Sequence, residues 1–319
     1  MNGKGTTNND IPMYLRLENP TLFIALTKDD ICRNSAKYTA IMDAVHRAPD
    51  VGIHNIVAKV DNFTAIERLL YVTEKMHDIC TTFRVKSNNW DASFEEVETP
   101  RMAVCLDCED ELETFVRAMH GTSAKTPLLV KVTDQNVHNL VEVICNQETA
   151  AERTVIISAG VEFGNVPKSV KWYNLEQLYC KVIELQREFP NRKILMDYGI
   201  LPTRLLTEHP CNAYVCSRAT CHSGKNNLPR RIFVNEVGDL CPEHINISSR
   251  FYLGNIFDSS LDVIFTSYQN SDRHAAFLKL AKDTYLQWVA TSPYRVIPWS
   301  SLLVVKDENR NMIGENNGV

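Results

Sequence analysis

Short apolar runs alternate with stretches of helical periodicity from residue 21 to residue 197. Seven runs rich in apolar and β-branched residues have the length of buried strands and end at polar or turn-forming residues. They span residues 21–27, 54–60, 82–86, 102–106, 128–132, 155–158 and 193–196. Between them, apolar side chains recur at i, i+3, i+4 and i+7, as at Leu112, Phe115, Val116 and Met119, which predicts helices with one buried face.

This alternation predicts an α/β fold with a parallel sheet, since parallel strands need a long crossover connection, which is usually a helix. Right-handed crossovers would place the helices on the outside of a curled sheet. We therefore expect residues 20–205 to form a partial (β/α) barrel of the TIM type, preceded by an N-terminal tail over residues 1–19. In such a barrel the ligand lies at the carboxyl ends of the strands.

The alternation stops after Pro202, and the chain becomes rich in Cys, Asn, Ser, Arg and Gly until about Gly254. A segment with so few aliphatic side chains does not easily build its own core, so a bound metal would stabilise it. We expect a small cysteine-rich domain over residues 206–270 and a C-terminal helix within 271–298 that packs on the body. A polar tail over residues 299–319 would follow.

Composition and charge narrow the function classes. The 319 residues are 44% apolar and 23% charged, with a net charge of −5, so no basic excess indicates nucleic acid or an anionic membrane as partner. We expect no signal peptide, because the first ten residues lack its apolar core, and no apolar run long enough to span a bilayer, phosphate loop or hydrolase motif occurs in the sequence. We expect a cytoplasmic protein without nucleic-acid or membrane partners, in a reducing setting where thiols can bind metal.

Four of the ten cysteines are concentrated in the cysteine-rich segment with the spacing C-x4-C-x4-C-x19-C. They are Cys211, Cys216, Cys221 and Cys241. Without signs of secretion, this concentration favours a metal site over disulfides. Four thiolates suit an iron-sulfur cluster or zinc, and the neighbouring His209, His222 and His244 would also allow a Cys3His zinc site. Buried cysteines without a metal are a third interpretation.

The residues around Cys241 also resemble a known family. Residues 231–242 read as a hairpin with a turn at Gly238 and end in Cys241-Pro242, and Leu253-Gly254-Asn255-Ile256 follows before a short helical stretch. This order resembles the SPASM or twitch extension of radical S-adenosylmethionine (radical SAM) enzymes. Cys221-His222-Ser223-Gly224 is similar to the family's Cys-x-x-Gly start, and residues 20–27 are similar to its first barrel strand. The resemblance implies a partial barrel of the radical SAM kind, followed by a small SPASM/twitch-like domain that binds a [4Fe-4S] cluster.

Two departures from that family indicate that the radical chemistry is lost. Its catalytic cluster is held by C-x3-C-x2-C after the first strand, whereas here Cys32 is followed at the partner positions by Ala36 and Thr39. The family's Gly-Gly-Glu-Pro phrase is replaced by residues 59–62, Lys-Val-Asp-Asn. One thiolate cannot hold a cubane cluster. We expect no reductive cleavage of S-adenosylmethionine, and no catalytic residue is assigned.

Since no cysteine follows Cys241, at most one auxiliary cluster is expected, on the four cysteines of the 206–270 segment. Our working hypothesis is an iron-sulfur-binding, radical-SAM-like protein that serves as accessory or substrate-binding partner of an active maturase, with a radical SAM paralogue or a peptide substrate as its partner. Two alternatives stay open. One is an enzyme with non-radical chemistry at the barrel mouth and a structural zinc or iron-sulfur clip, and the other is a noncatalytic electron carrier.

Two further groups of residues stand at predicted strand ends. Cys105 and Cys108 form a C-x2-C pair, which suggests a redox dithiol, extra cluster ligands or simply two strand-end cysteines. The neighbouring acidic residues oppose thiolate formation and favour the last of these. Seven acidic residues would gather at one mouth: Asp29, Asp30, Asp61, Asp107, Asp134, Glu162 and Asp197. They would form a binding face or cap the following helices, and we prefer the cap for Asp61 and Asp134.

Overall fold

The computed structural model has the strands that the apolar runs predict. It describes residues 13–14, 20–33, 35–76, 79–97, 101–109, 111–146, 153–158, 172–190, 193–196, 201–203, 229–297, 299–300 and 302–307. Its strands are β1 (Met13–Tyr14), β2 (Thr21–Leu26), β3 (Asn55–Val60), β4 (Cys80–Lys86), β5 (Met102–Asp107), β6 (Leu128–Lys131), β7 (Thr154–Ser158), β8 (Lys193–Met196), β9 (Leu201–Pro202), β10 (Arg231–Val234), β11 (Leu240–Pro242) and β12 (Val296–Ile297). The seven predicted strands, now β2 to β8, are confirmed to within two residues at either end.

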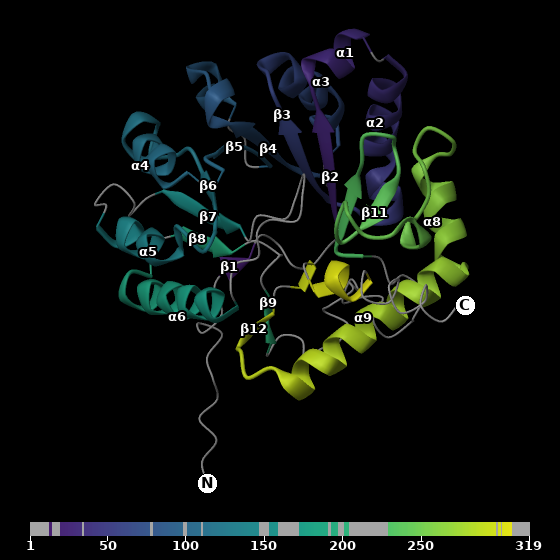
Figure 1. Ribbon diagram of the computed structural model, residues 1–319. Helices are drawn as coiled ribbons and strands as arrows, with labels where there is room; N and C mark the ends of the chain where they lie inside the picture. The colour runs from purple at the N-terminus through teal and green to yellow at the C-terminus, as the bar shows by residue number, and fades with distance from the viewer. Residues whose placement is uncertain are drawn as a thin grey trace.

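Ten of these strands form one mostly parallel sheet, in the order β1-β8-β7-β6-β5-β4-β3-β2-β10-β11 (Figure 1). From β2 to β8 each strand lies beside the next one in the chain, and all these pairs are parallel. Among the described pairs of this sheet, only β10 with β11 is antiparallel. The mixed α/β class expected from the sequence is therefore confirmed, with the strand order of a singly wound β/α fold.

Helices connect the strands. They are α1 (Lys28–Arg33), α2 (Ser35–Arg47), α3 (Phe63–Thr73), α4 (Leu112–Gly121), α5 (Val137–Asn146), α6 (Trp172–Glu188), α8 (Leu261–Gln269) and α9 (Asp272–Thr291), together with short 3₁₀ turns at Ala48–Val51, Ser87–Asn89, Ala92–Glu96 and Ser249–Phe251. A search of the described helices finds none with the length and apolar character needed to cross a bilayer.

One predicted helix cap is wrong. Asn62, not Asp61, caps α3, because its Oδ1 accepts a hydrogen bond from Ala65 N at 3.0 Å. Asp61 instead accepts one from Lys28 N at 2.9 Å, at the start of α1. The first N–H groups of a helix have no partner within the helix, and here the carboxylate comes from the neighbouring strand end. Asp134 accepts a hydrogen bond from Asn174 Nδ2 at 2.9 Å and so links the turn before α5 to α6.

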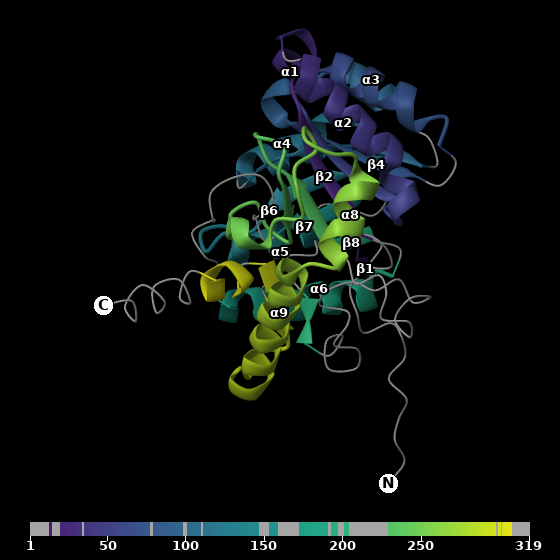
Figure 2. The same ribbon diagram turned by 90° about the vertical axis from the view of Figure 1, so that its right-hand side faces the viewer.

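Two apolar layers cover opposite faces of the β2–β3–β10 part of the sheet. On one face, side chains such as Leu22, Ile56 and Ile232 pack against α2, α3 and α8. On the other, Phe23 and Val57 pack in a cluster with residues of α9, Phe277 and Trp288 among them. Figures 1 and 2 both show α9 on the side of the molecule away from α1 and α3, so it lies toward the amino ends of these strands. Helix α9 therefore does not cover the carboxyl ends of these strands.

The described part of the predicted cysteine-rich domain shares the sheet formed by residues 20–205. Strand β10 pairs in parallel with β2, with Phe233 opposite Phe23, and the two rings stack with centroids 4.5 Å apart. Leu240, Leu253 and Ile264 belong to the same buried cluster as the strands and helices of the first half of the chain. The 229–270 region is thus anchored to the body by backbone hydrogen bonds and by apolar packing.

The C-terminal end differs from the predicted polar tail. Helix α9 agrees with the expected C-terminal helix, and Ser271 caps it by accepting a hydrogen bond from His274 N at 3.3 Å. Residues 302–307 are also helical, and Trp299 and Leu303 are fully buried against the cluster that contains Phe23. The pattern Trp299, Leu302, Leu303 supplies one apolar face, which is sufficient for a short helix to pack on a preformed body.

Candidate functional site

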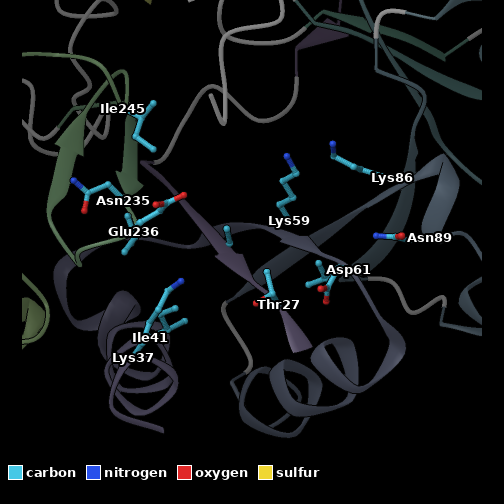
Figure 3. Close-up of a pocket in the computed structure, with 13 residues that line it drawn as sticks. Thr27, Lys37, Ile41, Lys59, Asp61, Lys86, Asn89, Asn235, Glu236 and Ile245 are labelled. Carbon is cyan, nitrogen blue, oxygen red and sulfur yellow. The ribbon is translucent and has the colours of Figure 1, made fainter. Parts of the chain in front are cut away.

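The carboxyl ends of β2, β3 and β4 open into a cavity of about 410 Å³ (Figure 3). Helix α2 and the end of β10 form its other side. The residues that line this carboxyl-edge pocket are Ala25, Thr27, Lys37, Ile41, Lys59, Val60, Asp61, Lys86, Asn89, Val234, Asn235, Glu236 and Ile245. Parallel β/α sheets present their ligands at this edge, because the loops after the strands can vary while the strands hold them in place.

Lys59 stands at the centre of the pocket. It is half-buried on β3, opposite Ala25 of β2 and Arg84 of β4 in the strand register. Figure 3 shows the ammonium groups of Lys59 and Lys86 directed into the same open space. Burial lowers the pKa of Lys59, and repulsion from Lys86 and Lys131 lowers it further, while Asp107 and Glu109 act in the opposite direction.

Lys86 is held at the pocket by Glu109. Its Nζ lies 2.6 Å from Glu109 Oε1, and this hydrogen bond lowers the pKa of the Glu109 carboxyl. Glu109 has a positive φ of 53°, and its N–H donates to Asp107 Oδ1 at 2.9 Å. The turn after β5 therefore places the Glu109 carboxylate against Lys86 of β4.

The wall opposite Lys86 is built from Thr27, which follows β2, and from side chains of α1 and α2. Asp30 accepts hydrogen bonds from Thr27 N and Thr27 Oγ1, both at 2.9 Å, and Lys37 Nζ lies 2.7 Å from its other oxygen. Burial alone would raise the pKa of Asp30, but the hydrogen bonds from Lys37 and Thr27 outweigh it, and the pKa is lowered. Lys37 is thus charge-paired within the protein and forms a fixed part of the wall.

The turn between β10 and β11 supplies the last side of the pocket. Asn235 Oδ1 accepts hydrogen bonds from Val237 N and Asp239 N, at 3.1 and 2.8 Å. Asn255 Nδ2 donates to Val237 O and to Asp239 Oδ1, at 2.8 and 2.9 Å. The Leu-Gly-Asn-Ile phrase of the sequence therefore acts locally by fixing this turn, which carries Glu236 to the mouth of the pocket (Figure 3).

Of the four predicted metal ligands, only Cys241 belongs to the described residues; Cys211, Cys216 and Cys221 lie outside them, as do His209 and His222. Cys241 lies on β11 opposite Phe233 and is fully buried in the cluster with Phe23. Burial raises the pKa of its thiol to about 12. A thiolate here therefore needs a cation to stabilise it.

A buried charged pair lies at the base of the hairpin that carries Cys241. Arg231 and Glu243 face each other across the base of β10 and β11, with Arg231 Nε 3.6 Å from Glu243 Oε2, and each side chain is 1% exposed. Within the described residues, Nη1 and Nη2 of Arg231 and Nε2 of His244 have no hydrogen-bond partner. His244 Nδ1 accepts from Asn246 N at 2.9 Å, so the neutral imidazole carries its proton on Nε2, which can act as a donor.

The positions that would carry the catalytic cluster of radical SAM enzymes hold one sulfur. Cys32 is exposed on α1, and Ala36 and Thr39 are exposed on α2. The neighbouring positions that do line the carboxyl-edge pocket are Lys37 and Ile41. No cluster of three or more metal-binding side chains occurs within the ranges that the structure describes.

Cys105 and Cys108 are both buried, with 0% and 1% of their surface exposed. Burial raises the pKa of Cys105 to about 12 and that of Cys108 still further, and the carboxylate of Asp107 adds to both. Neither thiol is poised to ionise, so the interpretation as two buried strand-end cysteines is the one this environment favours.

The acidic strand-end residues do not form a uniformly negative mouth in the described region. Asp30 pairs with Lys37 and Glu109 with Lys86; Glu162 and Asp197 lie outside the described residues. The sequence reasoning missed the lysines. Lys59 and Lys86 stand at the last or next-to-last position of predicted strands, as does Lys131, and this was the signal that could have found them.

Comparison of the chain with protein-family models and with curated proteins gives no match. The site is therefore interpreted from its own residues.

Proposed function

We propose that this protein is a radical-SAM-like accessory protein without the catalytic cluster, which binds one [4Fe-4S] cluster through Cys211, Cys216, Cys221 and Cys241. It holds a peptide or protein substrate for an active maturase, a complete radical SAM paralogue. On this proposal the sheet is a partial barrel of the radical SAM kind, and the segment around the four cysteines is its SPASM/twitch-like domain.

The observation that carries the proposal is the attachment of the Cys241 hairpin to β2, beside a pocket at the carboxyl edge of the sheet. The pairing of β10 with β2 puts the hairpin turn at the carboxyl edge of the sheet. The pocket at this edge supports a substrate-holding role. The absence of radical chemistry is supported by Cys32, which is the one thiol at the three cluster positions.

The residues at the base of the Cys241 hairpin fit a metal-sulfur centre. A buried thiol needs a cation to ionise, and N–H donors without partners among the described residues, on Arg231 and His244, suit the sulfur atoms of a cluster. When bound, the cluster would supply structural stability or electron transfer. The chain's own contribution is the enclosed thiol and the donors around it.

Anaerobic purification with iron, sulfide and zinc analysis tests the metal. About four irons and four sulfides per chain are expected. Cys241→Ala should lose the cluster, whereas Cys180→Ala, at a half-buried position on α6, should keep it. A colourless, metal-free protein that is fully folded contradicts the proposal, and one zinc per chain replaces the cluster by a structural zinc site.

Incubation of the reduced protein with S-adenosylmethionine tests the absence of radical chemistry. No 5′-deoxyadenosine should form. Its accumulation at a rate proportional to the amount of purified chain would show that an active cluster assembles, contrary to the proposal.

A second function, an enzyme with non-radical chemistry at the sheet edge, is favoured by the environment of Lys59. An amine whose pKa is lowered by burial and by neighbouring ammonium groups is a candidate nucleophile toward carbonyl compounds. Borohydride reduction with a small aldehyde such as pyridoxal should then label Lys59 ahead of the exposed Lys282. Equal labelling of the two lysines excludes this enzyme function.

A further inference from the structure

Tyr252 lies between the predicted metal ligand Cys241 and the carboxyl-edge pocket. We propose that Tyr252 is a positioning residue of the metal centre, whose hydroxyl donates a hydrogen bond to the Cys241 sulfur and is itself held by Asn235 at the pocket. This rests on the proposed function, because the role assigned to Tyr252 is to set the reduction potential of the centre that Cys241 helps to bind.

Backbone pairing brings Tyr252 to Cys241. Leu240 N donates a hydrogen bond to Gly254 O at 2.8 Å, and Leu253 N donates one to Leu240 O at 2.9 Å. These two bonds hold the segment that contains Tyr252 directly beside β11, the strand that carries Cys241.

The alternation of side chains puts the two residues on the same face. Leu240 and Leu253 belong to the apolar cluster on the α2 side of the sheet. Cys241 belongs to the cluster that contains Phe23, and Tyr252, which is half-buried, packs against that same cluster. Because neighbouring residues of an extended segment point to opposite faces, the Tyr252 ring lies on the Cys241 side.

The Tyr252 hydroxyl is hydrogen-bonded to the Cys241 sulfur and to the side chain of Asn235. Asn235 Oδ1 already accepts from Val237 N and Asp239 N, at 3.1 and 2.8 Å, so the amide offers an N–H to the hydroxyl oxygen. The hydroxyl hydrogen is then directed at the sulfur. Since hydrogen bonds in a chain polarise one another, Asn235 strengthens the bond that Tyr252 donates.

The protonation state of Cys241 determines what this hydrogen bond does. The thiol Sγ lies 3.8 Å from Asp239 O, to which it can donate. A metal-bound thiolate has lost that proton and accepts instead, so the Tyr252 O–H becomes its donor. Burial raises the pKa of Tyr252 to about 12, and negative charge on Cys241 acts in the same direction, so the hydroxyl keeps its proton at neutral pH.

A hydrogen bond to a ligand sulfur favours the reduced state of a metal-sulfur centre, because the sulfur carries more negative charge in that state. Hydrogen bonds to the sulfur atoms are among the factors that set the potential of iron-sulfur clusters. Asn235 also lines the carboxyl-edge pocket (Figure 3). The same chain of side chains therefore connects the metal ligand with the cavity.

The test measures the reduction potential of the anaerobically purified full chain, by redox titration followed by electron paramagnetic resonance. Tyr252→Phe keeps the ring and removes only the hydroxyl. It should lower the equilibrium constant for reduction about tenfold, which makes the potential more negative by about 59 mV for one electron.

Tyr268→Phe is the matched control. The Tyr268 hydroxyl is buried in the other apolar cluster and has no hydrogen-bond partner among the described residues, so its removal should leave the potential unchanged. An unchanged potential in Tyr252→Phe overturns the proposal, as does an equal shift in both variants.

A second readout reports the proton itself. Electron-nuclear double resonance of the reduced protein in H₂O and D₂O detects exchangeable protons close to the cluster. Tyr252→Phe should lose one exchangeable coupling that the unaltered protein and Tyr268→Phe retain. Identical spectra of the three proteins contradict the hydrogen bond to the metal-bound sulfur.

Iron, sulfide and zinc content of the same samples separates this inference from the proposed function. A full cluster with the same potential in Tyr252→Phe and in the unaltered protein removes only the role of Tyr252, whereas a chain with neither iron nor zinc overturns both.

If the chain holds one zinc, exchange for cobalt(II) supplies the readout. Removing a hydrogen bond raises the energy of the thiolate electrons, so Tyr252→Phe should move the thiolate-to-cobalt absorption band to longer wavelength. A band at the same wavelength as in the unaltered protein overturns the proposal.

Discussion

Two charged clusters lie at opposite ends of the β10–β11 hairpin, and they differ in their access to solvent. At the base, Arg231 and Glu243 are each 1% exposed, and Glu243 Oε1 also accepts hydrogen bonds from Arg230 N and Arg231 N at 2.6 and 3.3 Å. At the turn, Lys59 and Lys86 face a cavity of about 410 Å³. Charged side chains thus stabilise the structure where protein encloses them, and they form a candidate binding site where a cavity adjoins them.

The largest effect is expected at the enclosed cluster. Glu243→Ala leaves Arg231 buried without its carboxylate and removes the acceptor of two backbone N–H groups. It should lower the free energy of unfolding by about 3 to 5 kcal/mol. Urea unfolding measures this, with Glu67→Ala on the exposed face of α3 as the control.

The double variant Arg231→Met/Glu243→Met sharpens the same test. Replacing both partners by apolar side chains should recover much of the lost stability, since no unpaired charge stays buried. If Glu243→Ala alone is as stable as the unaltered protein, the base of the hairpin is open to water. The contrast in solvent access between the base and the turn then disappears.

The turn that joins the two clusters is tested by a pair of glycines with nearly the same backbone angle. Gly238 has φ +85° and Gly52 has φ +82°, but an added Cβ at Gly238 would lie 2.7 Å from the Phe257 ring, whereas at Gly52 nothing lies within 4 Å. Gly52→Ala should cost about 1 kcal/mol from backbone strain, and Gly238→Ala about 2 to 4 kcal/mol from strain and overlap together. Equal costs in thermal unfolding would show that Phe257 moves aside.

His244 gives the enclosed end a dependence on pH. It is fully buried, and burial, helped by repulsion from Arg231, lowers its pKa to about 3. Below pH ~6.5 the unfolded chain binds a proton that the folded chain does not, so stability falls as the pH falls. Between pH ~6.5 and ~5 the unaltered protein should lose about 1.5 to 2 kcal/mol more than His244→Leu. Parallel pH profiles of the two proteins contradict the burial of His244.

The smallest effect on stability is expected at Lys59. Because its pKa is lowered in the folded state, the protonated amine destabilises the fold, and Lys59→Met should be neutral or slightly stabilising, within about 1 kcal/mol. As the pH rises toward ~10.5 the unaltered protein should gain stability relative to this variant. Chemical unfolding at neutral pH measures this. If Lys59→Met is strongly destabilised, Lys59 has a structural role, as Lys37 has through its pairing with Asp30.

Periodicity and side-chain type alone determined much of the fold. The strands β2 to β8 and helices such as α4 follow from the apolar pattern. Apolar side chains lie on one face of a strand when they recur with a period of two, and on one face of a helix when they recur with a period of 3.6. The cap on α3 shows the limit of local reasoning. Asp61 and Asn62 are both suitable cap residues, and the choice between them depended on α1, which offers Lys28 N to Asp61 from a different part of the chain.

Other features were decided by tertiary structure. Trp299 and Leu303 lie in the segment that the sequence predicts as a polar tail. They are buried because the folded body offers an apolar cluster for them to pack against. The carboxyl-edge pocket depends on the lateral order of strands, which brings Lys59, Lys86 and Glu236 together although they are far apart in the sequence. Sequence specifies which side chains are available and which local shapes they favour, whereas burial and charge proximity, which set their pKa values, arise only when distant segments share one edge of a sheet.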